Sequence, residues 1–178
     1  MVRVYTQRGA TLKRKLRLFA LSSALVAVPS SFVHPFGAVK AQRSDRPLLL
    51  DASFDAQVVG ILERSCQNCH SERTAWPWYS YVAPVSWMIE NDVQGGRRHM
   101  NLSRWNGYRP ERQQEILSEM SSVVKRRVMP LPRYLLIHPE ARLSDTEVDY
   151  LYHWAKSERN RFKTASASAN SAFTGTSR

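Results

Sequence analysis

The feature that most constrains this chain is the stretch CQNCH at residues 66–70, which holds both of its cysteines and a histidine. The spacing Cys-x-x-Cys-His is typical of the covalent attachment of c-type haem. The two thiols add to the two vinyl groups of the porphyrin, and the adjacent histidine can then coordinate the iron. We therefore predict Cys66 and Cys69 as attachment residues, His70 as an iron ligand, and one haem c as the cofactor.

Three other uses of the cysteine pair remain open at this point. A thioredoxin-like redox pair would need a βαβ setting, which the sequence does not show. A structural zinc site would need further ligands, for which His99, His138 or His153 are available. A disulfide across two intervening residues would constrain little of the unfolded chain. We favour haem attachment, because thioether bonds to haem form outside the cytoplasm and the N-terminus indicates export.

The first 41 residues are basic and then apolar. Of the 26 basic residues of the chain, seven lie in residues 1–41, which hold no acidic residue. The basic segment RGATLKRKLR, followed by the apolar run LFALSSALVAV, predicts an export signal. Residues 1–41 are expected to be either a signal peptide, cleaved at Val39-Lys40-Ala41, or a retained membrane anchor. The rest of the chain is only weakly basic, so we expect no nucleic acid as a partner.

Helical periodicity dominates the region after this segment. Apolar residues predict a first helix over about 54–64, with Ser53 as its N-cap. A second helix is expected over 85–94, where the pair Gly95-Gly96 should stop it.

Two more helices have clear start signals. Pro110 suits the first turn of a helix that continues over 111–127. Ser144 and Glu147 form a capping box that should begin the last helix. Because no alternating strand pattern persists, the predicted class is all-α, a small cytochrome c-like helical domain wrapped around a covalently attached haem.

Composition divides the chain into three parts. The folded haem-binding domain is expected over residues 48–160, after the N-terminal segment. Residues 161–178 are rich in Ser, Ala and Thr and poor in large apolar residues, and they are predicted to form a disordered tail.

A haem iron held by His70 has a second axial position. Met129 enters the sequence Pro130-Leu131-Pro132, which extends the backbone and lets a loop present one sulfur to a flat ligand. A methionine sulfur raises the reduction potential, whereas a second histidine lowers it by comparison. We predict Met129 as this ligand, with His138, Met100 or an open position as alternatives.

Two longer runs, TAWPWYSYVAPVSW and MPLPRYLLIHPEARLS, accompany CQNCH. Together they resemble the haem-binding domain family of bacterial monohaem c-type cytochromes, over about residues 54–158. The resemblance implies that Cys66, Cys69 and His70 hold the haem and that Met129, with the proline after it, supplies the methionine. In that family a second proline often follows the first directly, whereas Leu131 intervenes here.

Several other side chains are expected near the haem. The aromatic run Trp76, Pro77, Trp78 and Tyr79 should wall its pocket. The arginines Arg97, Arg98 and Arg104 either pair with the haem propionates or form a solvated basic face.

These observations predict a monohaem c-type cytochrome that carries single electrons and is not an enzyme. The alternative is a haem-based sensor or ligand-binding protein with an open or exchangeable sixth site. Expected partners are redox proteins and the cytochrome c maturation machinery. The expected location is the periplasmic side of the bacterial inner membrane, with the N-terminal segment as a tether unless it is cleaved.

Overall fold

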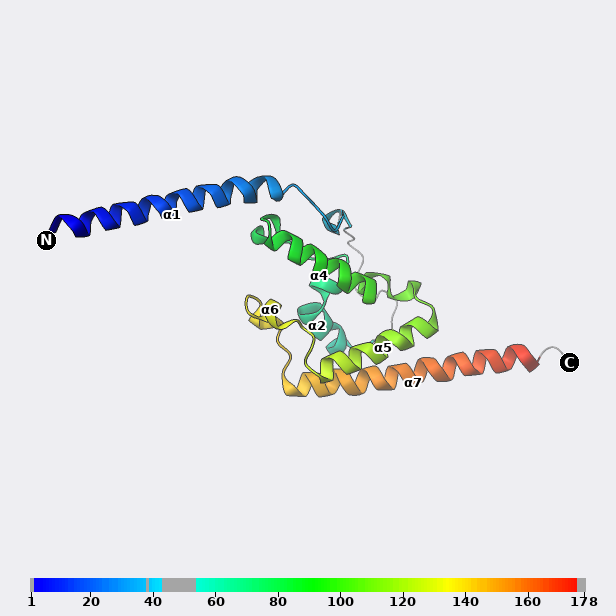
Figure 1. Ribbon diagram of the computed structural model, residues 1–178. Helices are drawn as coiled ribbons and strands as arrows, with labels where there is room; N and C mark the ends of the chain where they lie inside the picture. The colour runs from blue at the N-terminus through cyan, green and yellow to red at the C-terminus, as the bar shows by residue number, and fades with distance from the viewer. Residues whose placement is uncertain (1, 38, 43–53, 176–178) are drawn as a thin grey trace. The chain divides into compact units, whose positions relative to one another are not determined.

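The computed structural model describes residues 2–37, 39–42 and 54–175, and every regular element in these ranges is an α-helix or a 3-10 helix (Figure 1). The all-α prediction is therefore confirmed. The contacts divide the chain into two compact units, one made of residues 1–41 and 76–92 and the other of residues 42–75 and 93–178.

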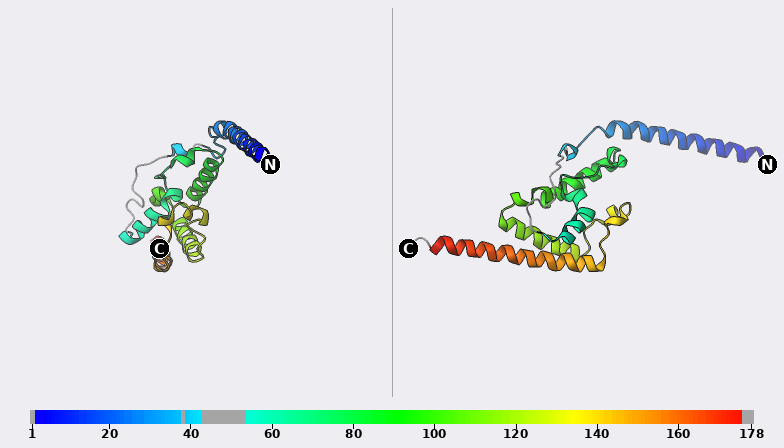
Figure 2. Two further views of the ribbon diagram at one scale, coloured as in Figure 1. Left: turned by 90° about the vertical axis from the view of Figure 1, so that its left-hand side faces the viewer. Right: turned by 180° about the vertical axis from the view of Figure 1, so that it is seen from behind.

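The first unit combines the N-terminal segment with the aromatic run. It holds α1 (Val2–Ser30), two 3-10 turns, η1 (Val39–Ala41) and η2 (Trp78–Tyr81), and the first part of α4 (Val85–His99). Figure 2 shows α1 as one long continuous helix. Of the helices in the described ranges, none is both long enough and apolar enough to cross a bilayer.

The second unit carries the CQNCH stretch. Its elements are α2 (Ala56–Ser65), α3 (Gln67–His70), the end of α4, η3 (Leu102–Gly107), α5 (Pro110–Lys125), α6 (Pro132–Leu135), η4 (Pro139–Ala141) and α7 (Asp145–Gly175). The helices α5 and α7 lie side by side and antiparallel (Figure 1 and the right-hand view of Figure 2).

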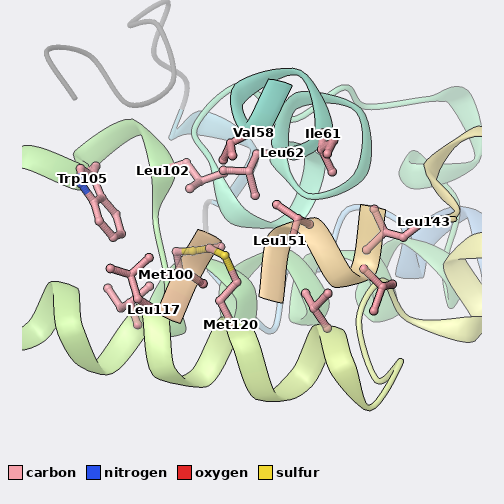
Figure 3. Close-up of a cluster of buried hydrophobic side chains, with 14 residues drawn as sticks. Val58, Ile61, Leu62, Met100, Leu102, Trp105, Leu117, Met120, Leu143 and Leu151 are labelled. Atoms are coloured by element: carbon pink, nitrogen blue, oxygen red, sulfur yellow. The ribbon is translucent and has the colours of Figure 1, made fainter. Parts of the chain in front are cut away.

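A single cluster of buried apolar side chains joins α2, η3, α5 and α7 (Figure 3). Its members include Val58, Ile61, Leu62, Met100, Leu102, Trp105, Ile116, Leu117, Met120, Val124, Leu143, Val148, Leu151 and Ala155. Phe54 packs edge-on against Trp105 and Trp154, with ring centroids 5.4 and 5.0 Å apart. This core packs against α2, the helix that leads into CQNCH.

Most helix ends follow the sequence signals. The Ser144 hydroxyl accepts from the Glu147 amide at 3.2 Å and the Glu147 carboxylate accepts from the Ser144 amide at 2.9 Å, so the capping box is confirmed. Pro110 lies in the first turn of α5, as predicted. The helix predicted over 54–64 is α2, which begins at Ala56. Its N-cap is Asp55, whose carboxylate accepts from the Gln57 amide at 2.8 Å. The predicted cap, Ser53, lies outside the described residues.

Two helices extend further than predicted. The helix α7 continues to Gly175, through a segment that we expected to be disordered from residue 161 onward. The boundary of the haem-binding domain at residue 160 stays a prediction. The helix α4 continues through the Gly95-Gly96 pair to His99, so the predicted stop at these glycines is wrong.

Candidate functional site

The residues of CQNCH lie at the corner between two helices. Cys66 follows the last residue of α2, and its amide donates to the Leu62 carbonyl at 2.9 Å. Cys66 is also the residue before α3, and its carbonyl accepts from the amides of Cys69 and His70 at 3.2 and 3.0 Å. One helical turn therefore brings both sulfurs and the imidazole to the same short segment.

Both cysteines are half-buried, and neither forms a disulfide. Burial raises the pKa of the Cys66 thiol to about 12, and the neighbouring Cys69 adds to this shift. Cys66 is therefore a protonated thiol at neutral pH in this fold. A pair of reduced thiols at this spacing fits two thioether bonds.

The His70 ring is oriented by the backbone. Its Nδ1 lies 3.2 Å from the Met100 carbonyl oxygen, and the Gly96 backbone also forms a hydrogen bond with the ring. Burial lowers the pKa of His70 from its ordinary value, against the opposing effect of these two hydrogen bonds. Because a carbonyl can only accept, Nδ1 carries the proton and the neutral ring keeps the Nε2 lone pair for a metal.

Gly96 allows α4 to lie directly against the attachment segment. A β-carbon at position 96 would lie 2.5 Å from the Cys69 carbonyl oxygen and 3.0 Å from the Cys69 carbonyl carbon. Only glycine fits there, because both atoms belong to the backbone and have little freedom to move. The glycine pair was interpreted from the sequence as a helix end. In the structure Gly96 instead allows two backbone segments to lie in close contact.

Arg97 fastens the chain that follows His70. Its Nε donates to the Ser71 carbonyl at 2.8 Å, and its Nη2 donates to the Thr74 hydroxyl at 3.0 Å. The same Thr74 hydroxyl donates to the Asn68 carbonyl at 2.8 Å. Arg97 thus binds the loop that closes the attachment segment, and its pairing with a haem propionate stays a prediction.

The other two arginines differ from Arg97 and from each other. Arg104 pairs with Glu72, whose carboxylate also accepts from the side-chain Nδ2 of Asn101 at 3.2 Å. Arg98 is exposed. The aromatic residues expected to wall a haem pocket belong to the other unit, where Trp78 is 78% exposed, so that expectation stays a prediction.

The predicted sixth ligand lies in the turn between α5 and α6. Met129 is half-buried and its amide donates to the Val123 carbonyl at 3.4 Å. A few residues further on, the Tyr134 hydroxyl accepts from the Asn68 side chain at 2.8 Å. This hydrogen bond ties the loop after Met129 to the segment between the two cysteines. The assignment of Met129 to the iron stays a prediction.

The two residues named as alternative sixth ligands, Met100 and His138, make contacts of their own in this fold, and both assignments stay predictions. Met100 is buried among Leu102, Leu117 and Met120 (Figure 3). The His138 ring stacks on Tyr134 with centroids 4.3 Å apart. Its Nδ1 lies 3.0 Å from the Glu140 carboxylate.

The donor set fits a covalently held haem better than it fits a zinc ion. Within the described ranges, no group of three or more His, Cys, Asp and Glu side chains is arranged to hold a metal ion. CQNCH instead supplies two thiols for covalent bonds and one oriented imidazole for an axial position.

The haem-binding domain family model matches residues 25–157. The chain belongs to this family. The resemblance seen in the sequence is thereby confirmed, and the protein is a haem-binding protein. The match begins within α1, so it includes the segment that connects α1 to the rest of the first unit.

One curated relative is cytochrome c peroxidase Ccp of Escherichia coli (strain K12), which is 25% identical over 122 residues. The aligned part covers 66% of this chain but only 26% of the peroxidase. The prediction that this protein is not an enzyme is contradicted by this similarity, because the relative is named as an enzyme. No solved structure matches the chain.

Proposed function

We propose that this protein is a monohaem c-type cytochrome that carries single electrons outside the cytoplasm. Cys66 and Cys69 would form the two thioether bonds, and His70 would hold the iron through Nε2. The observation that best supports this proposal is the contact of His70 Nδ1 with the Met100 carbonyl at 3.2 Å. It orients the imidazole from behind and leaves the other nitrogen for the metal.

The residues of the chain would position the haem and protect it. The haem, when bound, supplies one-electron redox chemistry at its iron. Gly96 and Arg97 hold the attachment segment and the loop after it, so the imidazole is presented in one orientation. Met129 would complete the coordination with a thioether sulfur, which favours the reduced iron and so raises the potential.

The proposed partners follow from this role. Electron transfer needs redox proteins that dock transiently near the haem edge. Attachment needs the cytochrome c maturation machinery, which acts outside the bacterial cytoplasm. The basic and apolar N-terminal segment supports export to the periplasmic side of the inner membrane, with that segment as a tether.

A second candidate function is the binding or reduction of a small ligand at an open or exchangeable sixth site. The similarity to a cytochrome c peroxidase favours peroxide over other ligands. The aligned part is a quarter of that relative, so the chain would serve either as a small peroxidase or as a haem-binding module of such an enzyme.

Spectroscopy of the haem-loaded full chain separates the two candidates. Coordination by Met129 predicts a low-spin ferric spectrum with a methionine–iron charge-transfer band, and a ferrous form that does not bind carbon monoxide. The variant Met129→Ala should lose the band and bind carbon monoxide. The control Met88→Ala, at a 46% exposed residue of α4, should keep both properties of the parent.

The opposite result would favour the second candidate. A high-spin parent that binds carbon monoxide, and whose ferrous form is rapidly oxidised by hydrogen peroxide, has an open site and is no simple electron carrier. A band that survives in Met129→Ala would show that another residue is the ligand.

A further inference from the structure

We propose that residues 31–41 are retained in the mature protein as a structural part of the folded domain, so that no cleavage occurs at Val39-Lys40-Ala41. The sequence alone left cleavage and retention open. The inference rests on contacts within the first unit, and it does not depend on the proposed redox function.

The chain just after α1 is held by two hydrogen bonds. The Ala83 amide donates to the Ser31 hydroxyl at 3.0 Å. The Trp87 indole donates to the Val33 carbonyl at 2.8 Å. A signal peptide that is cleaved off would not be expected to form specific hydrogen bonds with the folded domain.

The strongest contact is made by a buried carboxylate. Glu90, on α4, is only 1% exposed, and its Oε1 lies 2.9 Å from Lys40 Nζ and 3.0 Å from His34 Nδ1. Both partners come from residues 31–41. The described residues thus provide Glu90 with one lysine and one histidine from the segment that cleavage would remove.

Lys40 is itself built into the unit. Its ammonium also donates to the Ser80 carbonyl at 2.6 Å, and it lies 4.5 Å from the centre of the Tyr81 ring and 5.3 Å from that of Trp76. An ammonium close to two aromatic faces gains from their negative quadrupoles. Beside it in the turn η1, Val39 is only 3% exposed.

Removal of this segment would leave Glu90 without both partners. A carboxylate is costly to bury unless it is paired, so a fold that keeps Glu90 buried is destabilised when both partners are lost. The haem-binding domain match also starts at residue 25, before the proposed cleavage site. Retention of residues 31–41 therefore preserves the fold, whereas cleavage at Val39-Lys40-Ala41 would break it.

The first test is the intact mass of the haem-loaded protein, produced as the full chain with cytochrome c maturation factors and with no tag at its N-terminus. We expect a chain that begins at or before residue 31. A mature chain that begins at any later residue would overturn the proposal. The same spectrum shows separately whether haem is attached, so a failure of the haem assignment would not be mistaken for cleavage.

The second test asks whether the ion pair contributes to the fold. We expect Lys40→Met to lower the folding equilibrium constant by tenfold or more, because the buried Glu90 carboxylate loses its lysine partner and keeps only the more exposed His34. The matched control Lys13→Met removes a lysine from an exposed position of α1 and should leave stability unchanged. Equal stability of the two variants would show that Lys40 is a passive part of a linker and would overturn the proposal.

A double variant protects this test against simple misfolding. In Lys40→Met/Glu90→Leu no charge remains buried, so stability should recover relative to Lys40→Met. Additive losses, with no recovery, would mean that the two side chains do not depend on each other, contrary to the proposal.

Discussion

The carbonyl oxygen of Cys69 lies 2.5 Å from the point where a β-carbon of residue 96 would be. This closeness of Gly96 and Cys69 presses α4 against the segment that carries the sulfurs and the imidazole. The backbone of Gly96 and the carbonyl of Met100 then reach the His70 ring. The orientation of the imidazole thus depends on a residue without a side chain.

We predict that Gly96→Ala lowers the free energy of unfolding by about 1–3 kcal/mol, because the added methyl group overlaps a backbone carbonyl. Haem incorporation should fall as well, because α4 has to move away from His70. Gly95→Ala is the matched control, since nothing lies within 4 Å of its β-carbon position. That variant should be neutral or gain up to about 1 kcal/mol from helix propensity. Denaturant unfolding with a haem assay measures both effects, and equal behaviour of the two variants would contradict the close approach.

Removal of the two thiols should abolish covalent haem binding. On a denaturing gel stained for haem, the double variant Cys66→Ala/Cys69→Ala should show no stained band, because thioether bonds survive denaturation and coordination bonds do not. Each single variant should keep one thioether bond and stain more weakly than the parent. A parent protein without stain, after production with competent maturation factors, would rule out c-type attachment.

The core should be sensitive to truncation on the contact between α5 and α7. Leu117 is fully buried, so Leu117→Ala should cost about 2–5 kcal/mol through lost burial and the cavity left behind. Leu136 is 81% exposed, and Leu136→Ala should leave stability within about 0.5 kcal/mol of the parent. Comparable losses in thermal unfolding of both variants would mean that the cluster in Figure 3 is not the core.

The capping box should make stability depend on acid pH. Partial burial acts to raise the pKa of Glu147, but hydrogen bonds from Ser144 and the pairing with Arg64 outweigh it, so the pKa is lowered from 4.5. A carboxyl with a depressed pKa stabilises the fold fully above its unfolded pKa, and the gain is lost as pH falls through the folded value. Stability measured from pH 7 to pH 3 should therefore fall as the pH drops below 4.5 and Glu147 becomes protonated.

The matching variant is Glu147→Gln, in which this part of the pH dependence should disappear. Glu111→Gln, in the first turn of α5, is the control and should keep it, since Ser144 and Arg64 still bind Glu147. If the free energy of unfolding of Glu147→Gln still fell below pH 4.5 as in the parent, the charge of Glu147 would make no contribution to stability.

The parts of the structure that the sequence predicted correctly are local. The proline that begins α5 and the Ser144–Glu147 box each depend on residues a few positions apart, whose geometry is set within one helical turn. Apolar periodicity likewise identified α2, because its buried face repeats with the helical period.

The features that sequence reasoning missed depend on partners far along the chain. A glycine pair is an ordinary helix stop, and nothing near Gly96 in the sequence indicates that Cys69 lies against it. An arginine such as Arg97 is usually expected at the surface, but it donates to Ser71 and Thr74 in the loop after His70. Glu90 gave no signal either, because its partners His34 and Lys40 lie in a segment that has the composition of a removable leader.

Cys66 both ends α2 and precedes α3, so one residue forms the joint between the two helices. A porphyrin bonded to the Cys66 sulfur would be attached at this joint, and its second covalent bond would lie one helical turn further on, at Cys69. Loss of the haem and local unfolding between α2 and α3 would then occur together. In such a protein, colour would report directly on the integrity of the backbone.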